Sequence, residues 1–127
     1  MPSQPFSTVT SDRLWERLTI TRDTLNHLCK SAHIAELALF GSILRDDFRD
    51  DSDIDLLVTY LPDAQRGLIE AAQLQHIFER AFNRKVDLIS KNGLQHSRNH
   101  RRRDDILKSA KVIYVSQPTE SQPKLSD

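Results

Sequence analysis

Aspartates crowd one short stretch in the middle of the chain, and two of them have a spacing that suits chemistry. Asp53 and Asp55 stand two apart in a run with the alternating pattern of a β-strand, so both carboxylates are expected on one face of that strand. Two unpaired carboxylates side by side repel each other unless cations neutralise them. Such oxygen ligands suit Mg²⁺, which usually takes one or two carboxylates and completes its shell with substrate phosphates and water. Two such ions can clamp an in-line phosphoryl transfer.

A Gly-Ser pair and a third aspartate add to this pattern. Gly41 and Ser42 follow a short apolar run and open a predicted helical turn. Glycine lets the backbone approach a ligand closely, and the exposed amides and the serine hydroxyl can bind phosphate oxygens at the start of a helix. Asp87 lies on another predicted strand, with its apolar neighbours facing the opposite way. That placement can bring a third carboxylate to the same face.

Each part of the pattern also has an ordinary interpretation. A Gly-Ser pair alone is usually a turn, and Asp-x-Asp alone can be a solvated strand end. A calcium loop of the EF-hand type fails, because reading Asp51 as its first position places Leu56 where Gly is required and Pro62 where Glu is required. Asp87 alone is more often a surface residue than a ligand. The combination of these parts, each on its predicted element, is what indicates a catalytic site.

The elements that must position these residues follow from the apolar periodicity. In chain order we expect a helix from Ser11 through Leu28, strands over 35–40 and 53–60, a helix over 65–82, a strand over 85–90, a turn at 92–93, a helix within 95–109 and a strand over 111–115. This order describes an α/β (α+β) sandwich, in which a small mixed β-sheet is flanked by helices. The first two strands are joined without room for a long crossover helix, so we expect them as antiparallel neighbours.

Length and composition are those of one globular domain. The chain has 127 residues, 38% of them apolar and 28% charged, which fits a folded soluble protein and argues against both a disordered chain and a membrane protein. The ends, residues 1–10 and 116–127, are rich in Ser, Thr, Gln and Pro and are interpreted as flexible tails. The folded domain is therefore expected over residues 11–115.

Charge balance and cysteine content bear on partners and location. Lysine and arginine number 18, as do aspartate and glutamate, so no net charge steers the chain toward nucleic acid or an anionic membrane. Cys29 is the single cysteine and cannot form an internal disulfide, which favours a reducing compartment. The first residues lack the pattern of a secretory signal, and no apolar stretch approaches the ~20 residues that span a bilayer. A cytoplasmic protein is expected.

A basic cluster follows the third predicted strand and consists of Arg98, His100, Arg101, Arg102 and Arg103. A nucleic-acid surface is one interpretation, but the net charge is zero and no aromatic side chains interleave for base stacking. A solvated helix face, partly paired with the two aspartates that follow, is favoured. Contact with an acidic patch on a partner protein stays open.

The stretch LFGSILRDDFRDDSDIDLLV resembles the signature of the DNA polymerase β nucleotidyltransferase superfamily, and specifically that of its minimal members. The similarity continues through KVDLIS to KVIYV. The resemblance implies a mixed-sheet catalytic core and Mg²⁺, as two ions, held by Asp53 and Asp55 with Asp87 as the third carboxylate. It also implies that Gly41 and Ser42 hold the triphosphate of ATP.

Arg45 matches the arginine of the GSxxR pattern of that superfamily. The resemblance implies that this side chain assists with the phosphates or pins the loop. The sequence departs from the pattern at Asp46, where many members carry Gly. That departure adds a negative charge near the triphosphate.

The resemblance also implies a partner. Larger superfamily members add a domain that binds the acceptor, and nothing in this chain fits such a domain. Minimal members are commonly antitoxins paired with a HEPN-fold RNase toxin, and relatives transfer AMP from ATP to a tyrosine hydroxyl of the toxin. That hydroxyl attacks the α-phosphate and pyrophosphate leaves, with Asp87 as the best candidate for general base or metal positioning. Two alternatives stay open, namely a non-catalytic antitoxin that acts by complex formation and a nucleotidyltransferase that modifies an antibiotic.

Overall fold

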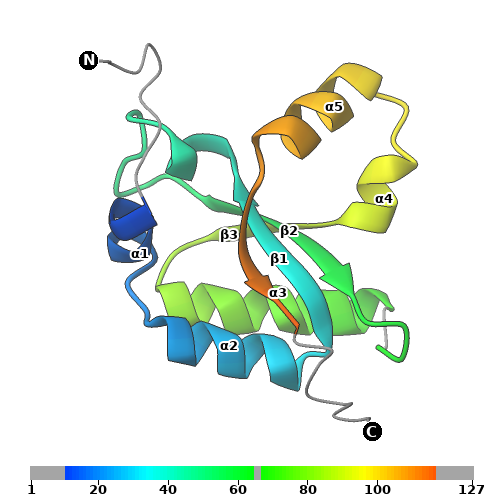
Figure 1. Ribbon diagram of the computed structural model, residues 1–127, viewed down its shortest axis with the longest axis horizontal. Helices are drawn as coiled ribbons and strands as arrows, with labels where there is room; N and C mark the ends of the chain where they lie inside the picture. The colour runs from blue at the N-terminus through cyan, green and yellow to red at the C-terminus, as the bar shows by residue number, and fades with distance from the viewer. Residues whose placement is uncertain (1–10, 65–66, 117–127) are drawn as a thin grey trace, which may run out of the picture.

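The computed structural model describes residues 11–64 and 67–116 of the chain as a four-stranded sheet with helices on both sides (Figure 1). In chain order the elements are α1 (Ser11–Leu18), α2 (Arg22–Ser31), β1 (Ile34–Phe40), the 3₁₀ turn η1 (Gly41–Leu44), β2 (Ile54–Tyr60), α3 (Leu68–Phe82), β3 (Val86–Ser90), α4 (Lys91–Gln95), α5 (His100–Ser109) and β4 (Lys111–Val115). The predicted tails, 1–10 and 116–127, lie outside the described residues except for Ser116. No helix within the described ranges is long and apolar enough to cross a membrane.

The sheet is mixed and has the order β3-β2-β1-β4. β1 pairs antiparallel with both β2 and β4, while β2 and β3 are parallel. The parallel pair needs a crossover connection, and α3 provides it. The expected mixed sheet and the antiparallel pairing of the first two strands are confirmed.

The sheet separates two apolar clusters. On one face, α1, α2 and α3 pack their buried residues, among them Leu14, Leu25 and Phe78, against Leu56 of β2. On the other face a smaller cluster joins Ala38, Phe40 and Leu57 of the sheet to Leu94 of α4 and Ile106 of α5. Figure 1 shows these two layers, with α2 and α3 on one side of the strands and α4 and α5 on the other. Because side chains alternate along β2, Leu56 and Leu57 belong to different clusters.

The predicted helix from Ser11 through Leu28 is wrong as a single element, because the structure divides it into α1 and α2. Thr19 between them has a φ of 62°, a left-handed conformation that interrupts the helix. Thr21 then caps α2 by accepting a hydrogen bond of 3.1 Å from the backbone N–H of Thr24. The apolar spacing continued across the break because both helices pack on the same core.

The predicted turn at Asn92–Gly93 is also wrong, since both residues lie in the short helix α4. Ser90 caps this helix by accepting a hydrogen bond of 3.0 Å from the backbone N–H of Gly93. Leu94 is buried in the smaller cluster. The serine cap and this tertiary contact outweigh the preference of Asn-Gly for a turn.

Candidate active site

Gly41 brings the turn after β1 into direct contact with Asp55. Its φ of +83° is one that side chains rarely adopt, and a β-carbon built on it would overlap the carboxylate of Asp55. Gly41 begins η1, which ends at Leu44, and the N–H of Arg45 closes that turn by donating to the carbonyl of Ser42 at 2.9 Å. The backbone of the Gly-Ser turn therefore lies against the acidic strand, as a phosphate-binding turn requires.

The strand register brings two aspartates together. Asp55 of β2 pairs directly with Asp87 of β3 across the parallel ladder, so their side chains share a face. Neighbouring strands lie about 4.8 Å apart, which makes these carboxylates neighbours. Asp53 stands one residue before β2 and is exposed, as is Asp87, whereas Asp55 is only partly exposed. The structure thus places all three predicted carboxylates at the end of the sheet where β2 and β3 begin.

Asp55 is the electrostatic centre of this site. Its pKa is raised to about 6, first by burial and then by the charges of Asp87 and Asp53, while Arg102 and Arg45 lower it. Burial disfavours the ionised form, and nearby like charges do the same. A cation bound here would relieve both effects and restore a fully ionised carboxylate.

The donor chemistry of the site fits Mg²⁺. Carboxylate oxygens are its preferred protein ligands, and one or two of them are usually enough. Within the described ranges, no group of three or more His, Cys, Asp and Glu side chains lies closely enough to hold a metal ion. The three aspartates therefore form no single three-ligand cluster, although Asp55 with one neighbour is a sufficient donor set for an ion that also binds phosphate.

Arg45 lies beside the site but is engaged with its own loop. Its Nε donates to Oδ1 of Asp47 at 3.2 Å, and both side chains are well exposed. Its charge still acts on Asp55. The structure thus supports a loop-pinning contact for Arg45 and keeps its charge near the carboxylates.

Arg102 contributes to the electrostatics of the site from the solvated helix face that the sequence analysis favoured for it. It stands four residues before Ile106, which anchors α5 in the smaller cluster on the face of Asp55. Residues four apart lie on the same side of a helix, although Arg102 is exposed where Ile106 is buried. Its charge acts on Asp55 more strongly than that of Arg45, and its side chain makes no ion pair with the described residues. The four-residue spacing from an apolar position was the signal that could have found it.

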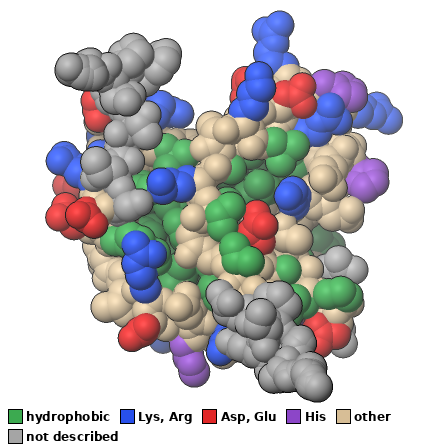
Figure 2. All heavy atoms as spheres, in the orientation of Figure 1, with side chains coloured by type: hydrophobic (Ala, Val, Ile, Leu, Met, Phe, Trp, Pro, Cys, Tyr) green, Lys and Arg blue, Asp and Glu red, His purple; other side chains and the backbone are tan. Residues whose placement is uncertain are grey.

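The rest of the basic cluster is exposed or partly engaged elsewhere. Arg101 is exposed, and Arg103 pairs with the neighbouring Asp104 at 3.3 Å. Figure 2 shows Lys and Arg side chains gathered around α5 at the top of the view. The expected solvated face with partial aspartate pairing is therefore observed, and Arg102, which is also exposed, differs only in that its charge acts on Asp55.

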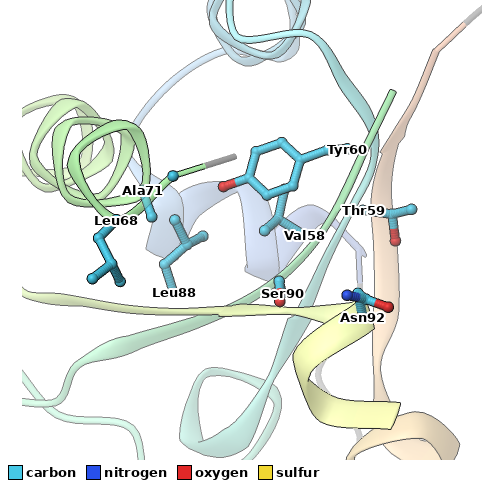
Figure 3. Close-up of a pocket in the computed structure, with 9 residues that line it drawn as sticks. Val58, Thr59, Tyr60, Leu68, Ala71, Leu88, Ser90 and Asn92 are labelled. Atoms are coloured by element: carbon cyan, nitrogen blue, oxygen red, sulfur yellow. The ribbon is translucent and has the colours of Figure 1, made fainter. Parts of the chain in front are cut away.

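A pocket of about 520 Å³ opens elsewhere, at the far ends of the same two strands. Its lining includes Val58 and Tyr60 of β2, Leu88 of β3 and Leu68 at the start of α3 (Figure 3). None of the three aspartates lines it. The candidate active site is instead the exposed end of the sheet where Gly41 meets Asp55.

Comparison with known proteins gives a family match over most of the chain. The family described as "Nucleotidyltransferase domain" matches residues 21–113. The protein adenylyltransferase MntA of Thermococcus cleftensis is 31% identical over 62 residues, which are 49% of this chain and 61% of MntA. The chain thus spans about 60% of the length of the first curated relatives it matches.

Solved structures share the fold. A structure described as a candidate minimal nucleotidyltransferase is 30% identical, with a TM-score of 0.59 over 80% of this chain and 97% of that one. A chain from the complex of a tri-AMPylated Shewanella oneidensis HEPN toxin with an MNT antitoxin is 19% identical, with a TM-score of 0.51 over 78% of this chain and 73% of that one. The second likeness concerns the fold alone.

Proposed function

The chain belongs to the nucleotidyltransferase domain family, and from that membership we propose that it is an antitoxin that transfers AMP from ATP to a tyrosine hydroxyl of a HEPN-fold RNase toxin. The observation that carries the proposal is the contact between the turn at Gly41 and the carboxylate of Asp55, which has Asp87 beside it in register. A phosphate-binding turn and a set of carboxylates thus meet at one end of the sheet. That arrangement suits the transfer of a nucleotidyl group.

Each site residue has a role in this proposal. Asp53 and Asp55 hold Mg²⁺, which neutralises phosphate charge and stabilises the leaving group when it is bound. The amides of the turn and the hydroxyl of Ser42 bind oxygens of the ATP triphosphate. The tyrosine oxygen forms a bond to the α-phosphorus. The bond between that phosphorus and the oxygen that bridges the α- and β-phosphates breaks, and pyrophosphate leaves. Asp87 accepts the proton of the hydroxyl or orients that group.

Exposure of the site supports a protein acceptor. Asp53 and Asp87 are both exposed, so a tyrosine on another protein can approach the carboxylates from solvent. The named activity of MntA and the AMPylated toxin in complex with an MNT antitoxin give the class of acceptor that we propose. We place this reaction in the cytoplasm, and the single cysteine, Cys29, is free and buried, as suits a reducing compartment.

Incubation of the purified chain with ATP, Mg²⁺ and a HEPN toxin encoded beside its gene tests the proposal. Mass spectrometry is expected to find the toxin heavier by one or more AMP groups, with the added mass on a tyrosine. The Asp53→Asn and Asp55→Asn variants are expected to lose this modification and the protection of cells from the toxin. Protection without any change in mass would instead support inhibition by complex formation alone.

The antibiotic-modifying alternative is separated by a different readout. It requires that cells expressing the chain survive higher concentrations of a hydroxylated antibiotic, and that the modified drug carry an AMP group. A resistance screen with the Asp55→Asn variant as its control decides this alternative.

A further inference from the structure

The loop between the Gly-Ser turn and β2 is held by two arginines from distant elements. It runs over residues 45–53 without helix or strand and carries four of the aspartates that precede Asp53. Arg49 and Ser52 close a turn within it, in which the backbone N–H of Arg49 donates to Oγ of Ser52 at 2.9 Å and the N–H of Ser52 donates to the carbonyl of Arg49 at 3.0 Å. The aspartates of the loop outnumber its own two arginines, so their mutual repulsion is relieved by cations from other elements.

Arg84, which follows α3, holds the second half of the loop. Its Nη1 donates to the backbone carbonyls of Arg49 at 2.7 Å, Asp50 at 3.2 Å and Ser52 at 2.8 Å. Its guanidinium also lies over the ring of Phe48, 4.3 Å from the ring centroid. Arg84 therefore fixes the backbone directly before Asp53 by hydrogen bonds.

Arg17 of α1 holds the first half in the same way. Its Nη1 donates to the carbonyls of Ile43 and Arg45, each at 2.7 Å. Its guanidinium lies 5.1 Å from the centroid of the Phe48 ring. Phe48 thus contacts two guanidinium groups, one of which holds the chain next to Ser42 and the other the chain next to Asp53.

We propose that Arg17, Phe48 and Arg84 form a clamp that positions the phosphate-binding turn relative to the metal-binding strand. All five carbonyls that the clamp binds belong to residues 43–52, between Ser42 and Asp53. The two guanidinium groups hydrogen-bond to backbone carbonyls rather than to the aspartate side chains of the loop, so they fix the path of the loop while their positive charge offsets the aspartates. Arg17 and Arg84 are positioning residues, because they act through the loop and not on a reacting atom.

The flat guanidinium is essential to this arrangement. One nitrogen of Arg84 reaches three carbonyls while the carbon of the guanidinium lies over the ring of Phe48, and a lysine, which has one nitrogen for both tasks, cannot reproduce this combination. Arg84→Lys therefore keeps the charge and removes the geometry. Arg80→Lys is the matched control, since Arg80 is an exposed arginine on the last turn of α3.

Limited trypsin digestion tests the clamp without reference to any activity. The loop contains two trypsin sites, after Arg45 and Arg49, whose cleavage can be timed by mass spectrometry on the folded full chain. Arg84→Lys and Phe48→Leu are expected to speed cleavage at these two bonds about tenfold, because cleavage requires local opening of the loop. Arg80→Lys is expected to leave both rates unchanged. Wild-type rates in folded Arg84→Lys and Phe48→Leu would overturn the clamp.

The consequence for the site rests on the proposed function and is tested separately. In AMP transfer to the toxin, Arg84→Lys is expected to lower kcat at least tenfold with an unchanged midpoint of thermal unfolding, and Phe48→Tyr, which keeps the ring, is expected to retain activity. If Arg84→Lys speeds cleavage of the loop but leaves the rate of AMP transfer unchanged, the positioning role is overturned. Absence of transfer by the wild-type chain would count against the proposed function only, and the digestion would still decide the clamp.

Discussion

At the scale of single residues, Asp55 is the point on which the candidate site depends. It lies against the backbone of Gly41, stands in register with Asp87 and is partly removed from solvent. Burial and the two neighbouring aspartates act in one direction on its pKa, and Arg102 and Arg45 act in the other. The balance leaves this carboxylate harder to ionise than an ordinary aspartate.

That raised pKa predicts that Asp55→Asn stabilises the metal-free protein at high pH. A carboxyl group whose pKa of about 6 in the folded state exceeds its ordinary value of 3.8 contributes stability below the lower value and loses it as the pH rises through the higher one. The shift corresponds to at most about 3 kcal/mol, and we discount it to about 1 kcal/mol because the side chain is partly exposed. Thermal unfolding at pH 8 is therefore expected to show a rise in Tm of about 4 °C.

The same measurement at pH 4 is the control. There the wild-type Asp55 is protonated in the folded state and resembles the asparagine, so the two proteins are expected to unfold at nearly the same temperature. A variant that is less stable than wild type at pH 8 would contradict the electrostatic account of this residue.

Arg102 predicts an effect on nucleotide binding. Its charge acts on Asp55 from α5, so we expect it to attract the phosphate oxygens of ATP bound at the site. Arg102→Ala is expected to raise the KM for ATP about tenfold, the loss of one charge-assisted hydrogen bond. Arg101→Ala, an exposed neighbour on the same turn, is expected to change it little. Equal effects from both variants would indicate a general charge effect.

At the scale of elements, α5 shows how a helix that is almost entirely polar is nonetheless placed. Its only buried residue is Ile106, 6% exposed, and this one side chain joins α5 to the cluster of Phe40 and Leu57. The helix is capped by Asn99, whose side chain accepts from the backbone N–H of Arg102 at 3.0 Å. One apolar contact and one cap therefore determine where Arg102 lies.

Ile106→Ala is accordingly expected to affect both stability and the site. Removing a buried isoleucine side chain costs about 2–5 kcal/mol, toward the lower end for a small cluster that can relax. Denaturant unfolding is expected to show this loss, and the KM for ATP is expected to rise as it does in Arg102→Ala. Leu107→Ala is the control, because Leu107 is 37% exposed on the same helix. An unchanged KM in a destabilised Ile106→Ala protein would show that Arg102 acts independently of this anchor.

At the scale of the whole molecule, the sheet separates the larger apolar cluster from the carboxylates of the candidate site. The larger cluster with α1, α2 and α3 lies on one face, and the carboxylates lie on the other, beyond the smaller cluster under α4 and α5. The arginines of the clamp come from α1 and from the residues after α3, and they reach the loop at the end of the sheet where β1 ends and β2 begins. The acidic end of the sheet is therefore held by the two arginines of the clamp, while Asp53 and Asp87 are exposed to solvent.

The sequence by itself determined the strands and the candidate carboxylates. A period of two requires Asp53 and Asp55 to share a face, and the short connection after Phe40 allowed the antiparallel pairing that the structure has. The sequence did not determine where α1 ends and α2 begins, because the same apolar spacing suits one long helix or two helices that pack on one core. A left-handed Thr19 and a capping Thr21 decided that difference.

Only the tertiary structure decided how these parts meet. Strand register sets Asp87 beside Asp55, and close packing against Asp55 requires glycine at position 41. The charge of Arg102 also acts on Asp55, and Arg84 hydrogen-bonds to the loop. All of these interactions join residues that are distant in sequence. Local periodicity carries no information about such contacts, since they depend on strand register and on packing between elements. The carboxylates of the site can thus be predicted from the sequence, while the fold determines which arginines position them and offset their charge.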